Sequence, residues 1–143
     1  MLTEIGLRAR HVVELVVLRL ALPSRLAGQP LDQLLAELSA EPILAPALGL
    51  HRLDLLRVER GIARLRWIPS TCLYRALARY ALLHRSGASP TFVMAVDKRG
   101  IAETGHAWIE LNGIPFEETD DVTGYIITLR YRSGARDGKV DAP

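Results

Sequence analysis

The sequence has a single cysteine, and this shortage excludes whole classes of protein. Cys72 cannot form a disulfide within the chain, and zinc sites built from several cysteines are equally excluded. The histidines are few and lie far apart in sequence, so they form no paired metal-binding motif; they are His11, His51, His84 and His106. We therefore expect neither a disulfide nor a metal or other cofactor.

A surplus of charge of one sign is also missing. Lysine and arginine number 18 against 16 aspartates and glutamates, which gives a formal net charge of only +2. The mild basic clusters at 57–66 and 130–136 are not interleaved with stacking aromatic residues, which argues against a nucleic-acid-binding module. The first apolar stretch carries Glu4 and Glu14 and is too interrupted to be a signal peptide or to span a bilayer. We expect a cytoplasmic protein.

The length of 143 residues is typical of one domain, which we expect to span residues 1–132. Within it, residues 1–66 are rich in leucine and predict a helical N-terminal subregion, whereas residues 67–132 predict a helix followed by strands. The small, polar residues 133–143 predict a flexible tail.

The apolar spacing predicts a first helix over residues 3–22 that ends at Pro23. Pro30 fits the first turn of a second helix, in which leucines form one stripe. Two prolines and a glycine make residues 41–49 a connector, and residues 51–66 again show helical spacing.

The second half changes character. Residues 71–85 predict a helix that Gly87 terminates. Consecutive strands follow at residues 89–98, on both sides of the Asn112-Gly113 turn within 105–118, and at 123–132. In the last strand, alternation places four large side chains on one face: Tyr125, Ile127, Leu129 and Tyr131. This order predicts an α+β fold in which one helix packs on an antiparallel sheet.

Cys72 stands at the start of the predicted helix, with Ser70 or Thr71 as its N-cap. The first-turn amides and the helix dipole favour a thiolate, which is the form that attacks carbonyl carbon. A lone cysteine is also common as a small buried hydrophobic residue. Position alone leaves both interpretations open, because a nucleophilic cysteine further needs an imidazole and a group that orients it.

His106 is the histidine best placed to serve Cys72. His84 lies twelve residues along the same predicted helix, which is ~18 Å away at the usual helical rise. His106 begins a strand instead, and strand alternation puts it on one face with Trp108 and Glu110. A histidine at a strand end also commonly faces solvent, so this position by itself does not decide its role.

The acid that would orient His106 depends on the turn that follows the strand. A two-residue loop over 112–113 places Glu117 on the face of His106, whereas a three-residue loop over 111–113 sets Glu118 opposite it. Both loop lengths are common. Two further acids serve only if the strand bulges: Asp120 and Asp121.

The segment from Cys72 to Glu118 resembles the transglutaminase-like core of lasso-peptide leader peptidases. In that family, a CL-x-R-[SA]-L-A helix start is followed by LL-x-R-x-G, an apolar strand and HAW-[VI]-E-x-[DN]-G. Here the corresponding stretches read CLYRALA, LLHRSG and GHAWIELNG. The similarity covers roughly residues 67–118, and its linked spacing is more specific than the cysteine and HAW elements, which papain-like peptidases share.

The resemblance implies a role for each residue of a triad. Cys72 aligns with the family nucleophile and His106 with the general base that later acts as acid. The orienting residue of the family is usually an aspartate twelve positions after the histidine, and Glu118 occupies that position here. The spacing favours the three-residue loop, with Glu117 as the fallback.

The resemblance further implies a cysteine protease that removes the leader from a lasso-peptide precursor. A separate ATP-dependent cyclase would then close the freed core amine onto an acidic side chain. Nothing like the family's leader-binding domain precedes residue 67, which implies a separate leader-recognition protein as partner. A transglutaminase-like acyltransferase and a non-catalytic adaptor are the alternative functions.

Overall fold

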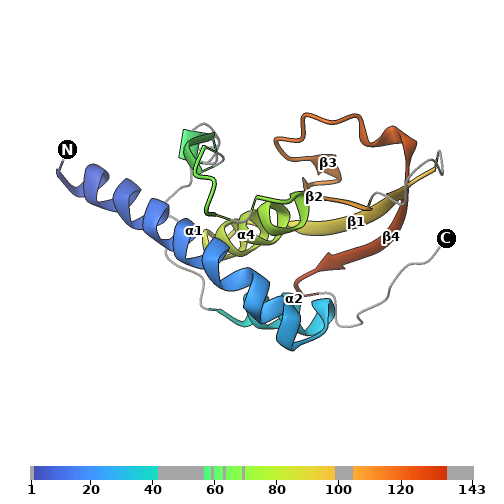
Figure 1. The fold of residues 1–143 in the computed structure, drawn as a ribbon, viewed down its shortest axis with the longest axis horizontal. Helices are drawn as coiled ribbons and strands as arrows, with labels where there is room; N and C mark the ends of the chain where they lie inside the picture. Colours follow the sequence, from blue (N-terminus) through green and yellow to red (C-terminus); the bar gives the residue numbers. More distant parts are fainter. Residues whose placement is uncertain are drawn as a thin grey trace.

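The computed structural model describes residues 2–41, 57–58, 60–62, 64–68, 70–98 and 105–134. Its helices come first along the chain: α1 (Leu2–Gly28), α2 (Leu31–Ala40) and α4 (Cys72–Arg85). The strands follow: β1 (Thr91–Asp97), β2 (Gly105–Leu111), β3 (Ile114–Pro115) and β4 (Tyr125–Arg132), with the short 3₁₀ helix η2 (Val122–Gly124) before β4 (Figure 1). The α+β class predicted from the sequence is therefore confirmed.

Several predicted features lie outside the described residues. They are the connector at 42–49, His51, half of the helix expected over 51–66, and the tail from 135 onward. The described residues 57–58 and 60–62 are helical as predicted, but residues 64–66 are not, so the prediction that this helix continues to residue 66 is wrong. None of the helices in the described ranges combines the length and apolar character needed to cross a bilayer.

Helix α1 does not end at Pro23, contrary to the sequence prediction, but continues for another turn. A proline inside a helix removes a backbone hydrogen bond and costs ~3 kcal/mol. The turns around Pro23 are held by contacts with α2, because Leu22 is fully buried and the Arg25 guanidinium lies 3.1 Å from the Glu37 carboxylate. Packing against a second helix thus outweighs the local preference of proline to end the first.

Helix α2 follows the predicted leucine stripe, although Pro30 is its N-cap and not a residue of its first turn. The stripe is fully buried and consists of Leu34, Leu35 and Leu38. Helix α4 contacts α1 and α2 and also lies against β2, so it connects the N-terminal helices to the sheet. Gly87 ends α4 with a φ of 87°, a conformation that glycine adopts without strain, as predicted.

The four strands form an antiparallel sheet in the order β3-β2-β1-β4. The last strand therefore does not lie beside β3 but at the opposite edge, next to β1. The chain must cross from one edge to the other between β3 and β4, and Figure 1 shows this crossover as an extended loop at one end of the sheet. The crossover carries the acidic residues that the sequence offered as partners of His106.

Strand β4 contains a bulge that changes which face its side chains occupy. Met94 pairs with Leu129, but the next residue of β1 pairs with Ile127, so Thr128 has no partner in the ladder. The four large side chains of β4 are half-buried in alternation, as predicted, but they do not share one face. Leu129 and its neighbour two residues on pack with the α4 cluster, whereas Tyr125 and Ile127 pack on the other side of the sheet.

The sheet thus has two apolar clusters, one on each face. The larger cluster joins the helices to the sheet, and β2 contributes Ala107 and Ile109 to it. The smaller cluster consists of Val93, Ala95 and Trp108, with η2 and the start of β4 packed against it. Because successive residues of a strand point to opposite faces, His106 and Trp108 lie on the face away from α4.

Candidate active site

Cys72 is the first residue of α4, where the sequence placed it. Thr71 is the N-cap, and its hydroxyl oxygen accepts a hydrogen bond of 3.3 Å from the backbone amide of Tyr74. The thiol is only partly buried, which separates it from the fully buried alanines and leucines of the same helix. Its sulfur lies 3.9 Å from the carbonyl oxygen of Gly105, the residue that precedes His106. The start of α4 and the start of β2 therefore meet.

His106 is buried, with a side chain that is 9% exposed, and it is enclosed by aromatic rings. Its ring centroid lies 5.7 Å from that of Trp108 and 5.3 Å from that of Tyr125. The two aromatic rings also contact each other edge to face, at 6.2 Å. The imidazole thus packs against two aromatic rings at the start of β2, the end of the strand that meets the start of α4.

The Glu118 carboxylate contacts the imidazole of His106. One carboxylate oxygen, Oε2, lies 3.3 Å from Nε2 of His106, and both side chains are only 9% exposed. The other oxygen, Oε1, accepts hydrogen bonds from the backbone amides of Thr119 at 3.0 Å and Asp120 at 3.1 Å. The carboxylate is therefore anchored by the backbone through one oxygen and presents the other to the imidazole.

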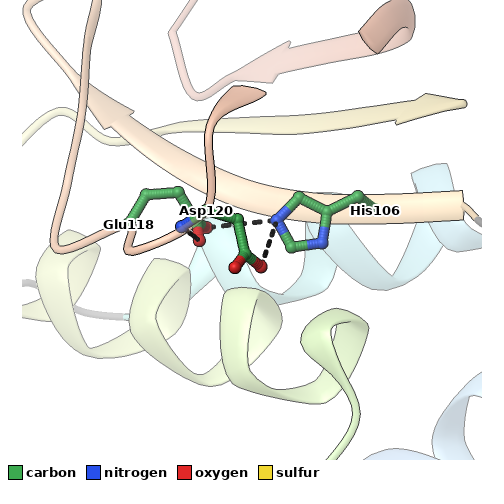
Figure 2. A group of neighbouring side chains, drawn as sticks. All are labelled: His106, Glu118 and Asp120. Carbon is green, nitrogen blue, oxygen red and sulfur yellow. Dashed lines mark hydrogen bonds and ion pairs between the residues drawn. The ribbon is translucent and has the colours of Figure 1, made fainter. Parts of the chain in front are cut away.

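A second carboxylate stands close by. Oδ2 of Asp120 lies 3.7 Å from Nε2 of His106, although the Asp120 side chain is 61% exposed. Figure 2 shows that Nε2 faces both carboxylates, while the other ring nitrogen points away from them. Among the described residues, Nε2 has no hydrogen-bond partner.

The turn between β2 and β3 is the two-residue form, so the three-residue loop that the family spacing favoured is wrong. Leu111 pairs with Ile114, and the central residues Asn112 and Gly113 have φ values of 53° and 77°. Positive φ at both central positions defines a type I′ turn, for which Asn-Gly is the preferred sequence. In a regular ladder of this register, the residue on the face of His106 would be Glu117.

Glu118 nevertheless reaches His106, because the ladder ends and the chain kinks. The last backbone contact with β2 is from the amide of Phe116 to the carbonyl of Ile109, at 2.7 Å. The following residue, Glu117, has a φ of 51°, which is an uncommon conformation for a residue other than glycine. This left-handed residue breaks the strand alternation and turns Glu118 toward the imidazole.

Arg79 of α4 holds the kink in place. Its side chain is buried, and one guanidinium nitrogen donates to the carbonyl oxygens of Phe116 at 3.2 Å and Glu117 at 3.1 Å. These carbonyls belong to the two residues that immediately precede Glu118. A charged donor on α4, the helix that begins at Cys72, thus fixes the loop that carries Glu118.

Further along β2, Glu110 and Arg130 hold the Trp108 ring that packs against His106. The indole nitrogen of Trp108 donates to Glu110 at 3.3 Å, and the Glu110 carboxylate is 3.3 Å from the Arg130 guanidinium. Glu110 is buried, so the arginine supplies the charge partner that a buried carboxylate needs.

Of the other histidines, the structure describes the surroundings of His84. His84 is buried in α4 and stacks on Tyr80, with ring centroids 6.2 Å apart. Burial raises the pKa of the Tyr80 hydroxyl, which shares a 2.6 Å hydrogen bond with Ser39. His84 therefore belongs to the packing of the helices, in agreement with its exclusion on helix geometry. His11 lies in α1.

Sequence reasoning missed Tyr125 and Arg79, and it admitted Asp120 only in the case of a bulge. Tyr125 reaches the imidazole because the β4 bulge moves it to that face, and the sequence around Thr128 carries no signal for this bulge. An arginine among the buried positions of an otherwise apolar helix face was the available signal for Arg79.

The comparisons with known proteins identify the class. A model of the transglutaminase-like superfamily matches residues 15–130, which is most of the chain. The chain belongs to the transglutaminase-like superfamily. No curated protein and no solved structure matches it significantly.

The match to the superfamily begins well before residue 67, so it includes most of the N-terminal helices as well as the segment that carried the motifs. Helix α4 packed on a four-stranded antiparallel sheet is consistent with the core of this superfamily. The fold is typically that of cysteine hydrolases and transferases.

Proposed function

We propose that the chain is a cysteine peptidase in which Cys72 is the nucleophile, His106 the general base and acid, and Glu118 the residue that orients the imidazole. The observation that carries this proposal is the anchored Glu118 carboxylate, 3.3 Å from a buried imidazole whose backbone adjoins the thiol. The match to the transglutaminase-like superfamily supports it.

The side chains supply each step of a thiol hydrolysis. The Cys72 thiol gives its proton to His106, and the thiolate attacks the peptide carbonyl to form a tetrahedral intermediate. The backbone amide of Cys72 lies in the first turn of α4, where amides lack an acceptor within the helix, and donates to the oxyanion. The imidazolium of His106 then protonates the departing amine, and the C–N bond breaks to leave a thioester.

Water completes the cycle. His106, again neutral, accepts a proton from water, whose oxygen attacks the thioester carbonyl. Collapse of this second intermediate releases the acid and returns the sulfur to the thiol form. Throughout, the negative charge of Glu118 stabilises the imidazolium and keeps the ring from rotating.

The substrate we propose is the precursor of a lasso peptide, cut between leader and core. Support comes from the linked motifs that begin with Cys72 and end with Glu118, which resemble those of lasso-peptide leader peptidases. A separate leader-recognition protein would present the precursor, and an ATP-dependent cyclase would use the freed core amine. The exposed apolar residues of α1 are available as a contact surface for such a protein: Val12, Val13, Val17 and Leu20.

The test is a cleavage reaction followed by mass spectrometry of every product. The full chain is incubated with its cognate precursor peptide and leader-recognition protein. We expect two fragments whose masses sum to the precursor plus one water. A leader fragment that carries an added amine would indicate an acyltransferase, and an intact precursor would indicate an adaptor; either result contradicts the peptidase.

A further inference from the structure

His106, Glu118 and Asp120 bring three metal-ligating atoms together. Nε2 of His106 lies 3.3 Å from the Glu118 oxygen and 3.7 Å from the Asp120 oxygen, and one donor atom from each residue falls within 4.8 Å of the others. We infer that these atoms form a binding site for a divalent transition-metal ion such as Zn²⁺, and that occupancy of this site switches the thiol chemistry off.

The geometry fits such an ion. Zinc binds nitrogen and oxygen at ~2.0–2.1 Å in a tetrahedron, so two of its ligand atoms lie about 3.3 Å apart. The two distances from Nε2 are close to this value, and all three donor atoms lie within 4.8 Å of one another. One imidazole with two carboxylates is a ligand set that suits zinc and its neighbours, and it leaves a fourth position open.

A second observation points to a ligand at this place. Nε2 of His106 is buried and has no hydrogen-bond partner among the described residues, yet it faces both carboxylates (Figure 2). A buried nitrogen without a hydrogen bond is costly, and an ion between the three groups would satisfy it. The amides that bond to Oε1 of Glu118 would serve as the outer support that orients a metal-ligating carboxylate.

The consequence for catalysis rests on the proposed function. A neutral imidazole carries one proton, and a metal on Nε2 confines that proton to the other ring nitrogen. The ring then has no free lone pair for the proton of the Cys72 thiol. Metal binding and thiol activation are therefore alternative uses of one imidazole, and the ion acts as an inhibitor with no part in the reaction.

Binding can be measured without activity. Isothermal titration of Zn²⁺ alone into the Cys72→Ala variant should show one site, with the same affinity as in the wild-type chain. The Asp120→Asn variant should bind at least tenfold more weakly, while Glu117→Gln, a carboxylate of the same loop, should bind as the wild type does. Equal affinity in Asp120→Asn would overturn the inference.

Co²⁺ identifies the ligands directly. A cobalt complex in wild-type protein should lack the near-ultraviolet absorption of a thiolate-to-cobalt transition, because the sulfur is not a ligand in this arrangement. Appearance of that band, together with its loss in Cys72→Ala, would place the metal on the thiol and contradict the assignment.

Cleavage assays separate this inference from the proposed function. If the precursor is cleaved, Zn²⁺ should inhibit the wild-type chain, and inhibition of Asp120→Asn, scaled to its own metal-free rate, should require at least tenfold more ion. Metal binding without any cleavage would contradict the peptidase and leave the site intact. Cleavage that Zn²⁺ does not affect would contradict the switch alone.

Discussion

The two faces of the β-sheet differ in chemical character, although one strand supplies both. Strand β2 gives Ala107 and Ile109 to the face covered by α4, where the large apolar cluster lies. It gives His106, Trp108 and Glu110 to the other face, where polar groups are paired one by one. The helix-covered face holds the chain together by bulk burial, and the opposite face holds individual side chains in fixed orientations.

The difference separates two kinds of interaction: apolar burial on one face of the sheet and contacts between individual polar side chains on the other. Apolar burial is roughly additive over area and tolerates substitution of similar volume. A buried polar contact such as that between His106 and Glu118 depends on distance and direction, and removing one partner leaves the other without it. We therefore expect changes on the helix face to reduce stability and changes on the opposite face to reduce turnover.

The largest contrast should come from the two buried histidines. His106→Ala should reduce kcat/KM for precursor cleavage by ~10⁴-fold, because the nucleophile and base of a catalytic unit fail together. His84→Ala, in the helix that carries Cys72, should keep kcat/KM within about threefold and lose ~1 kcal/mol of unfolding free energy. Cleavage kinetics and urea denaturation of both variants measure this, and similar kcat/KM values would remove the distinction.

The second-largest expected effect is a difference in kcat between substitutions of the adjacent residues Glu118 and Glu117. Glu118→Gln should lower kcat roughly 10²- to 10⁴-fold, since a neutral amide cannot stabilise the imidazolium and can hold the wrong tautomer. Glu117→Gln should change kcat by less than about threefold, because its φ of 51° turns it out of the alternation that would face His106. The reverse order of the two kcat values would assign the orienting role to Glu117.

A change confined to the helix-covered face should affect stability instead. Ile109 is fully buried in the larger cluster, so Ile109→Ala should lower the free energy of unfolding by about 2–5 kcal/mol. Ile114 is 67% exposed in the adjacent strand, and Ile114→Ala should stay within ~0.5 kcal/mol. Equal losses in urea denaturation would show that α4 does not cover this face in solution.

The smallest effect concerns the residue that links the two regions. Arg79→Met removes the charged donor from the carbonyls of Phe116 and Glu117 and should cost about 1–3 kcal/mol of unfolding free energy. The Arg79→Met variant should also lower kcat more than it changes KM. The reason is that the loop carrying Glu118 loses the arginine contact that fixes it, whereas Arg79 itself is not expected to contact substrate. Arg132→Met, at an exposed position of β4, is the matched control. A change in KM alone would indicate that Arg79 binds substrate.

Much of the fold could be predicted from short-range patterns in the sequence. The capped start of α4, its glycine end and the Asn-Gly turn are short-range signals, and each is found where the sequence put it. The end of α1 at Pro23 was wrong because packing against α2, which lies outside any local window, decides it. The β4 bulge was missed because the pairing of β4 with β1, a strand distant in the sequence, determines it.

The residues of the candidate site also divide into those placed by local sequence patterns and those placed by tertiary contacts. Cys72 and His106 stand at element starts, so their positions could be predicted from capping and alternation. Glu118 could be placed only by its spacing in a family, and the loop geometry inferred from that spacing was wrong. The kink at Glu117 and the Arg79 contacts that hold it are tertiary, and a single sequence offers no rule for them.

The most direct test of the central claim is the rate of precursor cleavage by Cys72→Ala beside Ser70→Ala, which changes an exposed neighbour of the nucleophile. Both variants are assayed with the leader-recognition protein present and with folding checked by circular dichroism. A thiol nucleophile predicts no cleavage above background for Cys72→Ala and near wild-type cleavage for Ser70→Ala. Wild-type cleavage by a folded Cys72→Ala variant would contradict the assignment of Cys72 as nucleophile.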